Sequence, residues 1–224
     1  ELAVAGAACH AVTPDVLASL CERDDLQGVV ATFALFGARI DETAGRAALA
    51  AAIARRRAGG RVPRPGGPGL VVVLDRLQDP GNLGALLRAA DAAGADAVVC
   101  VEPSVDPFDP RAVRGSMGSL FTVPLAATVD VTALAGWLGA AGYALVGADA
   151  HAGAPWGAGV LDGPDGVALV LGNEARGLSA DLAARLAARV RLPMYGQAES
   201  LNVAVAGGIL MYAWLRAAAP PEGR

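Results

Sequence analysis

The sequence predicts an α/β protein built on a parallel sheet. Four short apolar runs recur along the chain, at 70–74, 97–101, 143–148 and 167–172, and stretches of helical character separate them. Continuous apolar character is typical of strands that are buried on both faces of a sheet. Strands that alternate with helices favour parallel pairing, because each helix returns the chain to the edge from which the strand started.

The elements of this main region follow one another in a regular order. After the first strand, Pro80-Gly81-Asn82 interrupts the chain, and the residues from Leu83 to Ala93 predict a helix. The remaining predictions are helices at about 110–118, 130–141 and 179–187, a short strand near 189–192, and a closing helix at about 200–217.

The residues before this region have a different character. Residues 13–22 predict a helix that is capped by Thr13 and has Pro14 at its first position. A strand is expected over 28–35 and a charged helix over about 41–57. The Gly- and Pro-rich stretch 59–69 is typical of a flexible linker. We therefore expect an N-terminal segment 1–58, a linker 59–69 and a main domain 70–218.

Composition excludes several classes of protein. A hydrophobic fraction of 54% in 224 residues supports a well-filled core and argues against disorder. Cys9, Cys21 and Cys100 lack the spacing of a metal site, so no metal is expected, and reduced thiols fit a cytoplasmic protein. The longest apolar run, 203–215, is too short to cross a bilayer, so no membrane partner is expected.

The basic residues are unevenly distributed. All 18 are arginines, for which codon bias is the plain explanation. The net charge of −4 is not typical of a nucleic-acid-binding protein. Segment 36–67, however, has seven arginines against two acidic residues, or +5, and contains Arg55, Arg56 and Arg57. Arginine donates two parallel hydrogen bonds to a phosphate, so this segment is a candidate phosphate-binding surface, with a solvated linker as the alternative.

Three predicted strands end in glycine or polar residues. These ends are Gly147-Ala148-Asp149, Gly172-Asn173-Glu174 and Leu192-Pro193-Met194. Open α/β sheets bind ligands beyond the carboxyl ends of their strands. The chain has no lysine for a P-loop and no GxGxxG motif after its first strand. These loops suit an adenosine held by backbone groups and apolar side chains, and ordinary tight turns are the alternative.

Arg88 lies six residues after Asn82 in a predicted helix that is otherwise apolar and small. Arginine is rarely buried without a partner. From spacing alone, Arg88 could pair with Asp91 or Glu174 and have a purely structural role.

Three blocks of the sequence combine glycines with single polar residues: DRLQDPGNLGALLRAADAAG at 75–94, LGNEARGLS at 171–179 and LPMYGQAESLNVAVA at 192–206. Taken together, these blocks resemble the motifs of the SpoU/TrmH (SPOUT) RNA ribose 2′-O-methyltransferases. The segment RGSMGSLFTVPL at 114–125 is similar to a further segment of that family. Ala204, where many members have serine, and Glu199, where small residues are common, depart from the pattern.

The resemblance implies a role for specific residues. The family's first motif places Asn82 and Arg88 at the target ribose, the second supplies Glu174, and the third supplies Ser200, Leu201 and Asn202. The implied cofactor is S-adenosyl-L-methionine, held by loops 147–149, 171–174 and 192–202. The expected cofactor contacts are Gly147, Leu171, Gly172, Leu192, Met194 and Leu201, and the expected RNA contacts are Arg88, Arg114, Arg55, Arg56 and Arg57.

The resemblance also implies an architecture and an activity. A deep trefoil knot is expected in the C-terminal third, and a homodimer in which the partner chain completes each active site. Residues 1–35 resemble the end of a small α/β RNA-binding domain, with ERDDLQGVVATFAL as its closing strand. The implied reaction is methylation of a ribose 2′-hydroxyl in RNA, with rRNA favoured over tRNA. A knotted RNA-binding protein without catalysis, and a SPOUT methyltransferase acting on a base, are the alternatives.

Overall fold

The computed structural model describes residues 8–20, 28–60, 62–63, 69–162 and 166–218. The chain divides into two compact units, Glu1–Leu35 and Phe36–Arg224. In the first unit the structure describes one helix, α1 (Pro14–Ser19), in which the Thr13 hydroxyl accepts a hydrogen bond from the backbone N–H of Val16. The predicted cap and the proline at the first helical position are therefore confirmed.

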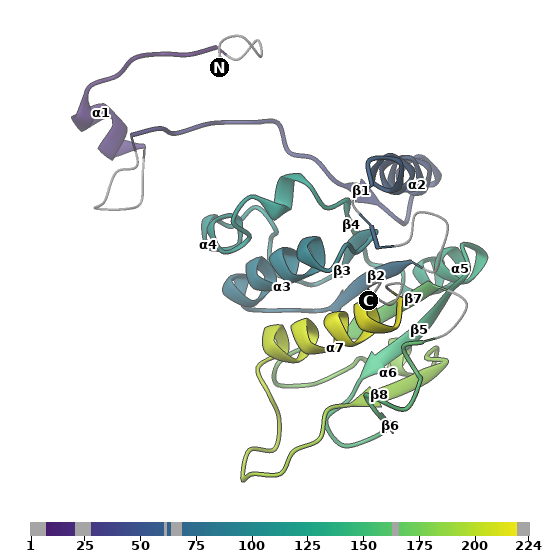
Figure 1. Cartoon of the computed structure of the whole chain (residues 1–224). Coiled ribbons are helices and arrows are strands. Elements are labelled where there is room, and N and C mark those ends of the chain that lie inside the picture. Colours follow the sequence, from purple (N-terminus) through teal and green to yellow (C-terminus); the bar gives the residue numbers. More distant parts are fainter. Residues whose placement is uncertain (1–7, 21–27, 61, 64–68, 163–165, 219–224) are drawn as a thin grey trace, which may run out of the picture. The chain divides into compact units, whose positions relative to one another are not determined.

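The second unit is built on a parallel sheet (Figure 1). Within the described residues the sheet has eight strands in the order β1-β4-β3-β2-β7-β5-β8-β6. The strands are β1 (Ala38–Arg39), β2 (Leu70–Asp75), β3 (Ala97–Val101), β4 (Leu125–Thr128), β5 (Tyr143–Ala148), β6 (Ala154–Pro155), β7 (Gly166–Leu171) and β8 (Ala188–Arg191).

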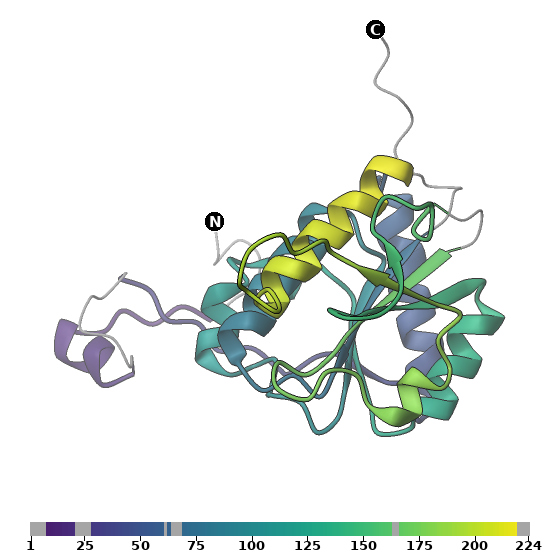
Figure 2. The ribbon, with the colours of Figure 1, turned by 90° about the horizontal axis from the view of Figure 1, so that it is seen from below.

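Helices cover both faces of this sheet (Figure 2). They are α2 (Thr43–Ala58), α3 (Pro80–Ala92), α4 (Pro110–Gly115), the 3₁₀ turn η1 (Ser119–Phe121), α5 (Val131–Ala140), α6 (Ala180–Ala183) and α7 (Val203–Ala218). Side chains from α3, α4 and α7 pack on one face, and side chains from α2, α5 and α6 pack on the other.

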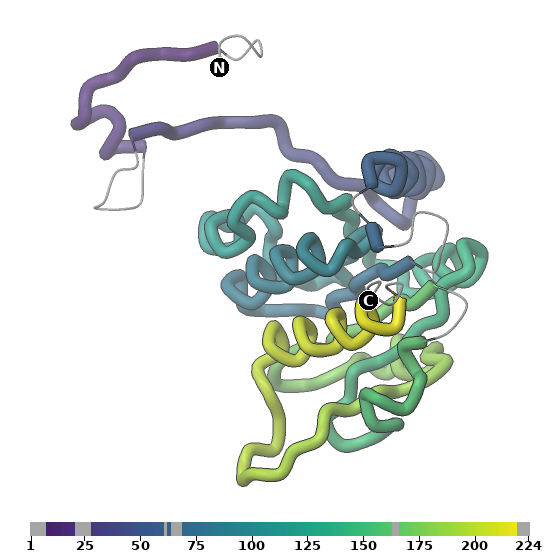
Figure 3. Tube along the Cα trace, in the orientation of Figure 1, coloured from purple at the N-terminus to yellow at the C-terminus, as the bar shows by residue number. Residues whose placement is uncertain are grey.

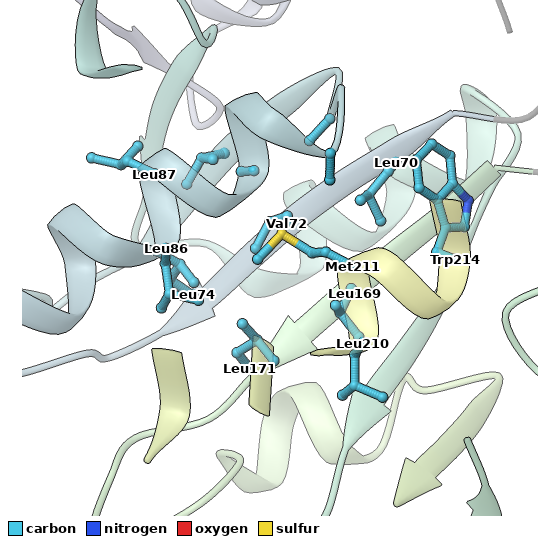
Figure 4. Packing of buried hydrophobic residues seen from close by; sticks show 14 of the residues in the cluster. Leu70, Val72, Leu74, Leu86, Leu87, Leu169, Leu171, Leu210, Met211 and Trp214 are labelled. Atoms are coloured by element: carbon cyan, nitrogen blue, oxygen red, sulfur yellow. The ribbon is translucent and has the colours of Figure 1, made fainter. Parts of the chain in front are cut away.

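Strand β2 explains why the apolar runs of the sequence are continuous. It pairs with β3 and β7, and all six of its residues are buried. Successive side chains of a strand point to opposite faces, so Val72 joins the cluster beneath α3 and α7 whereas Val71 and Val73 join the cluster beneath α2 and α5. Figure 4 shows the first cluster, with Met211 and Trp214 of α7 beside the leucines of β2 and β7.

Glycines allow close contact between the helices that carry the site. A Cβ atom at Gly84 of α3 would lie 2.6 Å from the carbonyl oxygen of Ala112 and 2.9 Å from backbone atoms of Gly115. At Gly207 of α7, a Cβ would lie 2.5 Å from Leu86 and 2.7 Å from Leu171. The absence of side chains at these two positions lets α3 lie directly against both α4 and α7.

The predicted main-domain elements are confirmed, with shorter helices than expected at α4 and α6. Three strands and the turn η1 were not predicted: β1 and β6 have only two residues each, and β4 is rich in alanine. The strand expected over 28–35 is wrong, because these residues form no helix or strand. Much of the predicted linker 59–69 lies outside the described residues.

The observed division of the chain at 35/36 differs from the predicted boundary at 59–69. Leu49 and Ile53 of α2 belong to the same buried cluster as Val71 and Val73 of β2. Helix α2 is therefore part of the main body. The sequence of 41–57 did not indicate this packing, because only two apolar residues of the helix are buried, one helical turn apart, among alanines and arginines.

Candidate active site at the carboxyl edge of the sheet

The carboxyl ends of β5, β7 and β8 surround a cavity of about 830 Å³. Its size lies within the range of small-molecule sites, roughly 300–1,000 Å³. The loop between β8 and α7 runs away from the sheet and turns back to form one wall (Figure 3). Of the residues expected at the cofactor or at the reaction, the cavity is lined by Leu171, Gly172, Glu174, Leu192, Met194, Ser200, Leu201 and Asn202.

The loop after β7 is folded tightly against itself. Asn173 and Gly177 form a two-residue antiparallel bridge, and Gly177 has a positive φ of 66°. A Cβ at Gly172 would lie 2.4 Å from the backbone carbon of Gly177. The Asn173 side chain donates to the carbonyl oxygen of Arg76 at 2.8 Å and accepts from the N–H of Ala175 and Arg176, each at 3.0 Å. These contacts fix the loop that presents Glu174.

Glu174 receives hydrogen bonds from the first turn of α3 and from the two residues before it. Its Oε1 atom accepts from the Asn82 side-chain amide at 3.0 Å and from the Asp79 N–H at 3.3 Å, and its Oε2 atom accepts from the Gln78 N–H at 3.3 Å. Burial alone would raise the pKa of the Glu174 carboxyl, but the hydrogen bonds from Asn82 and the backbone outweigh burial and hold the pKa below 4.5. Glu174 is therefore ionised at neutral pH.

Asn82 connects Glu174 to the loop before α7. Its Oδ1 atom accepts a hydrogen bond from the Asn202 side-chain amide at 2.9 Å. Asn202 in turn caps the start of α7, since its Oδ1 atom accepts hydrogen bonds from the N–H of Ala204 at 2.9 Å and of Val205 at 3.3 Å. An asparagine in this position caps the free N–H groups of a helix. Three residues predicted from separate blocks are thus joined by direct hydrogen bonds.

The floor of the cavity is apolar. Leu171 and Leu192 are buried, and Met194 is partly buried against the main cluster. Gly147, also expected at the cofactor, does not line the cavity but lies one residue before Ala148, which does. A Cβ at Gly147 would lie 2.5 Å from Leu186, so this glycine serves the packing under the loop.

Asp149 and Arg189 also line the cavity; Asp149 was expected there only as part of loop 147–149, and Arg189 was not expected. The Arg189 guanidinium donates to Asp149 Oδ2 at 2.6 Å, and Asp149 Oδ1 accepts from the N–H of His151 at 2.9 Å. Burial would raise the pKa of Asp149, but these hydrogen bonds and the Arg189 charge lower it. The polar strand end at 147–149 was the available signal for Asp149, whereas nothing in the sequence indicated that β8 would pair with β5.

Arg88 is exposed on α3 and does not line the cavity of its own chain. Within the described residues its guanidinium makes no hydrogen bond or ion pair. The partners considered from spacing are engaged elsewhere: Asp91 with Arg56 at 2.9 Å and Glu174 with Asn82. Arg114 is exposed in the last turn of α4, the helix that contacts α3 at Gly84.

The three consecutive arginines near the end of α2, Arg55, Arg56 and Arg57, have different surroundings. Arg56 is only 6% exposed and donates to the carbonyl oxygens of Ala95 and Thr122 and to Asp91. Arg57 forms a bidentate ion pair with Asp96, at 2.7 Å for both bonds. The expectation that Arg56 contacts RNA is therefore corrected, because its guanidinium is enclosed by the protein. Arg55 is exposed, whereas Arg61 and Arg64 lie outside the described residues.

No group of three His, Cys, Asp or Glu residues that could hold a metal ion occurs within the described part of the chain. Across the same residues, no helix combines the length and apolar character needed to cross a membrane.

Comparison with known proteins identifies relatives of this arrangement. The chain is 40% identical over 142 residues to the 23S rRNA (guanosine(2553)-2'-O)-methyltransferase RlmP of Bacillus subtilis (strain 168), covering 63% of this chain and 56% of that protein. It is 35% identical over 152 residues to the 23S rRNA (uridine(2479)-2'-O)-methyltransferase of Streptomyces viridochromogenes, covering 66% of this chain and 52% of that protein. The chain thus spans about half the length of these curated relatives.

Solved structures are similar as well. The AdoMet-bound rRNA methyltransferase from Sinorhizobium meliloti superposes with a TM-score of 0.76 at 32% identity, covering 91% of this chain and 70% of that one. The SpoU methyltransferase AviRb from Streptomyces viridochromogenes, in complex with AdoMet, gives a TM-score of 0.63 at 33% identity, covering 70% and 63%. Residues 69–212 match the model of the SpoU rRNA Methylase family, and the chain therefore belongs to that family.

Proposed function

We propose that this chain transfers a methyl group from S-adenosyl-L-methionine to a ribose 2′-hydroxyl of RNA, with rRNA favoured over tRNA. The observation that carries the proposal is the hydrogen-bonded set of Glu174, Asn82 and Asn202 at the edge of the cavity. Family membership and the names of the relatives, which are rRNA 2′-O-methyltransferases, support the same reaction.

The cavity fits the cofactor. Its floor offers apolar side chains to an adenosine, and Gly172, at the end of β7, lines the same cavity. S-adenosyl-L-methionine, when bound, supplies a methyl group activated by the positive charge on its sulfur. The protein then has to hold the ribose hydroxyl in line with that methyl group and assist the loss of its proton.

Arg88 is the residue proposed to act on the hydroxyl. A guanidinium remains protonated in proteins, so Arg88 is not the base itself. It holds the phosphate beside the target ribose and stabilises the negative charge that develops on the 2′-oxygen. Glu174, Asn82 and Ser200 orient the ribose and the loop around it, and Asn202 fixes the start of α7. This arrangement of polar groups argues against a protein that has kept the fold and lost catalysis.

The proposal includes a homodimer. Arg88 does not line the cavity of its own chain, so a second copy has to complete the site. Helix α7 leaves two apolar side chains half exposed, Val205 and Tyr212, each with 51% of its surface accessible. These residues are covered in a symmetric pair of subunits. Light scattering at micromolar concentration should give the mass of a dimer, and a monomer would contradict this part of the proposal.

Three further features belong to the same proposal. The C-terminal part forms a deep trefoil knot, which is supported by the position of β7 between β2 and β5 and by the return of α7 to the face of α3. Glu1–Leu35 belongs to an RNA-binding part of the protein, a proposal supported by the resemblance of its sequence to the end of a small α/β RNA-binding domain. The enzyme acts in the cytoplasm.

The experiment is a methyl-transfer assay with labelled S-adenosyl-L-methionine and an unmodified 23S rRNA transcript. Arg88→Ala should lower turnover by at least ~100-fold, the low end for a positioned proton-transfer group. Arg88→Lys should also fail, because lysine lacks the planar fork. Calorimetry should show nearly unchanged cofactor affinity in both variants. Near-normal turnover in either variant would give Arg88 a structural role, and no cofactor binding to the parent protein would refute the proposal.

A further inference from the structure

A second, smaller cavity lies on the same edge of the sheet. Its volume is about 410 Å³, and it is lined by Arg76, Gln78, Pro103, Asn173, Ala175 and Arg176. These residues follow the ends of β2, β3 and β7, which are neighbours in the sheet. Three of them, Asn173, Ala175 and Arg176, also line the larger cavity, so the two spaces adjoin at the loop that carries Glu174.

Arg76 is held rigidly at this second cavity. Its Nε atom donates to the fully buried Asp75 carboxylate at 3.1 Å, and its backbone N–H donates to Val101 at 3.1 Å. Its carbonyl oxygen accepts from the side chains of Asn173 at 2.8 Å and Gln78 at 3.3 Å. The residue has a positive φ of 55°, an uncommon conformation for a side chain of this size. Among the described residues, the Nη1 and Nη2 groups of Arg76 have no hydrogen-bond or ion-pair partner.

Arg176 reaches the same cavity from the loop after β7. Its backbone N–H is fixed by Asn173, whereas its guanidinium makes no bond within the described residues. No carboxylate is among the residues that line this cavity. Asp75 is occupied by Arg76 and by the N–H of Ser179, and Glu174 is occupied by α3. Among the described residues, the cavity therefore presents the whole guanidinium of Arg176 and the two Nη groups of Arg76, whose Nε atom is paired with Asp75.

We propose that this cavity binds a backbone phosphate of the RNA, close to the nucleotide whose ribose is methylated. Guanidinium groups bind phosphate through paired, charge-assisted hydrogen bonds. A nucleotide whose 2′-hydroxyl lies at Glu174 and Asn82 has a phosphate on each side, and the cavity adjoins that position. Phosphate contacts fix register on a nucleic acid without reading its sequence. This inference rests on the proposed function and assigns Arg76 and Arg176 to positioning of the substrate.

The test compares three single variants, Arg176→Gln, Arg76→Gln and the control Arg185→Gln. The Arg176 guanidinium has no bond to lose among the described residues, so its variant should fold. Thermal melting checks the fold of Arg76→Gln, which leaves Asp75 without its cation. Arg185 donates to Asp181 and Thr132 and lines neither cavity, so its variant removes the same charge elsewhere. Binding of each protein to an unmodified 23S rRNA transcript is measured by fluorescence anisotropy at several salt concentrations.

The phosphate contact predicts a defined change in salt dependence. The slope of log affinity against log salt should become shallower by about 1 in Arg176→Gln and by about 1 in Arg76→Gln. The slope in Arg185→Gln should equal that of the parent protein. In the transfer assay, KM for RNA should rise in the first two variants while kcat at saturating RNA is kept, as expected for a uniform binding contact.

Two outcomes would overturn the inference. An unchanged salt slope in Arg176→Gln would show that no phosphate is bound in the cavity. A loss of S-adenosyl-L-methionine affinity by calorimetry, with an unchanged slope, would assign the arginines to the carboxylate of the cofactor. Because RNA binding is measured without turnover, absence of methyl transfer in the parent protein would refute the proposed function without deciding the phosphate site.

Discussion

The ion pair between Arg57 and Asp96 gives a sharp test of how α2 is attached to the main body. Asp96 is 1% exposed, and its carboxylate accepts two hydrogen bonds from Arg57 at 2.7 Å and one from the Tyr143 hydroxyl at 2.8 Å. The hydrogen bonds to Asp96 raise the pKa of Arg57. We predict that Asp96→Asn, which keeps the shape and removes the charge, strongly destabilises the protein.

The expected loss of stability in Asp96→Asn follows from the burial of the ion pair. Removing one partner of a buried pair costs about 3–5 kcal/mol, because the other charge is left without compensation. The Arg57 side chain is 28% exposed and can be partly rehydrated, so the lower end, about 3 kcal/mol, is expected. In a protein of this size that corresponds to a fall in melting temperature of about 6–12 °C.

The matched control is Asp109→Asn. Asp109 pairs with Arg111 at 3.4 Å at the surface, where the arginine side chain is 65% exposed, and it caps α4. Asparagine caps a helix as well as aspartate does, and an ion pair at the surface contributes little to stability. Urea unfolding measures both variants. If Asp96→Asn cost no more stability than Asp109→Asn, the ion pair between Arg57 and Asp96 would not anchor α2 as described.

Three other predictions follow from contacts at and around the site. In urea unfolding, Gly84→Ala should destabilise the protein by about 1–3 kcal/mol, because the new Cβ meets backbone atoms of α4. Gly139→Ala in α5, which has open space around it, should stabilise the protein by about 0.5–1 kcal/mol, and equal effects of the two variants would contradict the close packing at Gly84. Because the pKa of Glu174 is lowered on folding, its stabilising hydrogen bonds are present above pH 4.5 and are lost as the pH falls through the pKa of the folded protein. The difference in unfolding free energy between the parent protein and Glu174→Gln should therefore shrink below pH 4.5, and a constant difference would refute this. Burial, and to a smaller extent the charge of Glu102, raise the pKa of Cys100 to about 12. In a Cys9→Ser, Cys21→Ser protein at pH 8.5, iodoacetamide should therefore react with Cys100 about a thousandfold more slowly in the folded than in the unfolded protein, and fast labelling of the folded protein would contradict the burial of this thiol.

Much of the fold could be predicted because the interior of the sheet is recorded in the sequence. Strand β2 is buried on both faces, and a continuous apolar run such as LVVVL is typical of such a strand. Strands β1 and β6, two residues each, leave no periodic pattern, and the alanines of β4 are equally compatible with a helix. The exposed residues 28–35 were apolar enough to suggest a strand, but they have no sheet partner in the described chain.

The candidate site was predicted in part, for a similar reason. Asn82, Glu174 and Asn202 stand in separate blocks, and only the fold brings them within hydrogen-bonding distance. Arg56 and Arg57 looked like a basic surface, yet the acceptors that enclose them are 35 to 86 residues away in sequence. The sequence around Arg189 and Arg76 did not predict their places at the two cavities, because those places depend on which strands are neighbours in the sheet.

The central claim is that the methyl group goes to a ribose oxygen. The most direct test is mass spectrometry of nucleosides from an unmodified 23S rRNA transcript incubated with the protein and S-adenosyl-L-methionine bearing a deuterated methyl group. The account predicts one nucleoside with the deuterated methyl on its ribose, absent when Arg88→Ala replaces the parent protein. A deuterated methyl on a base, or an equal amount of ribose product with Arg88→Ala, would contradict it.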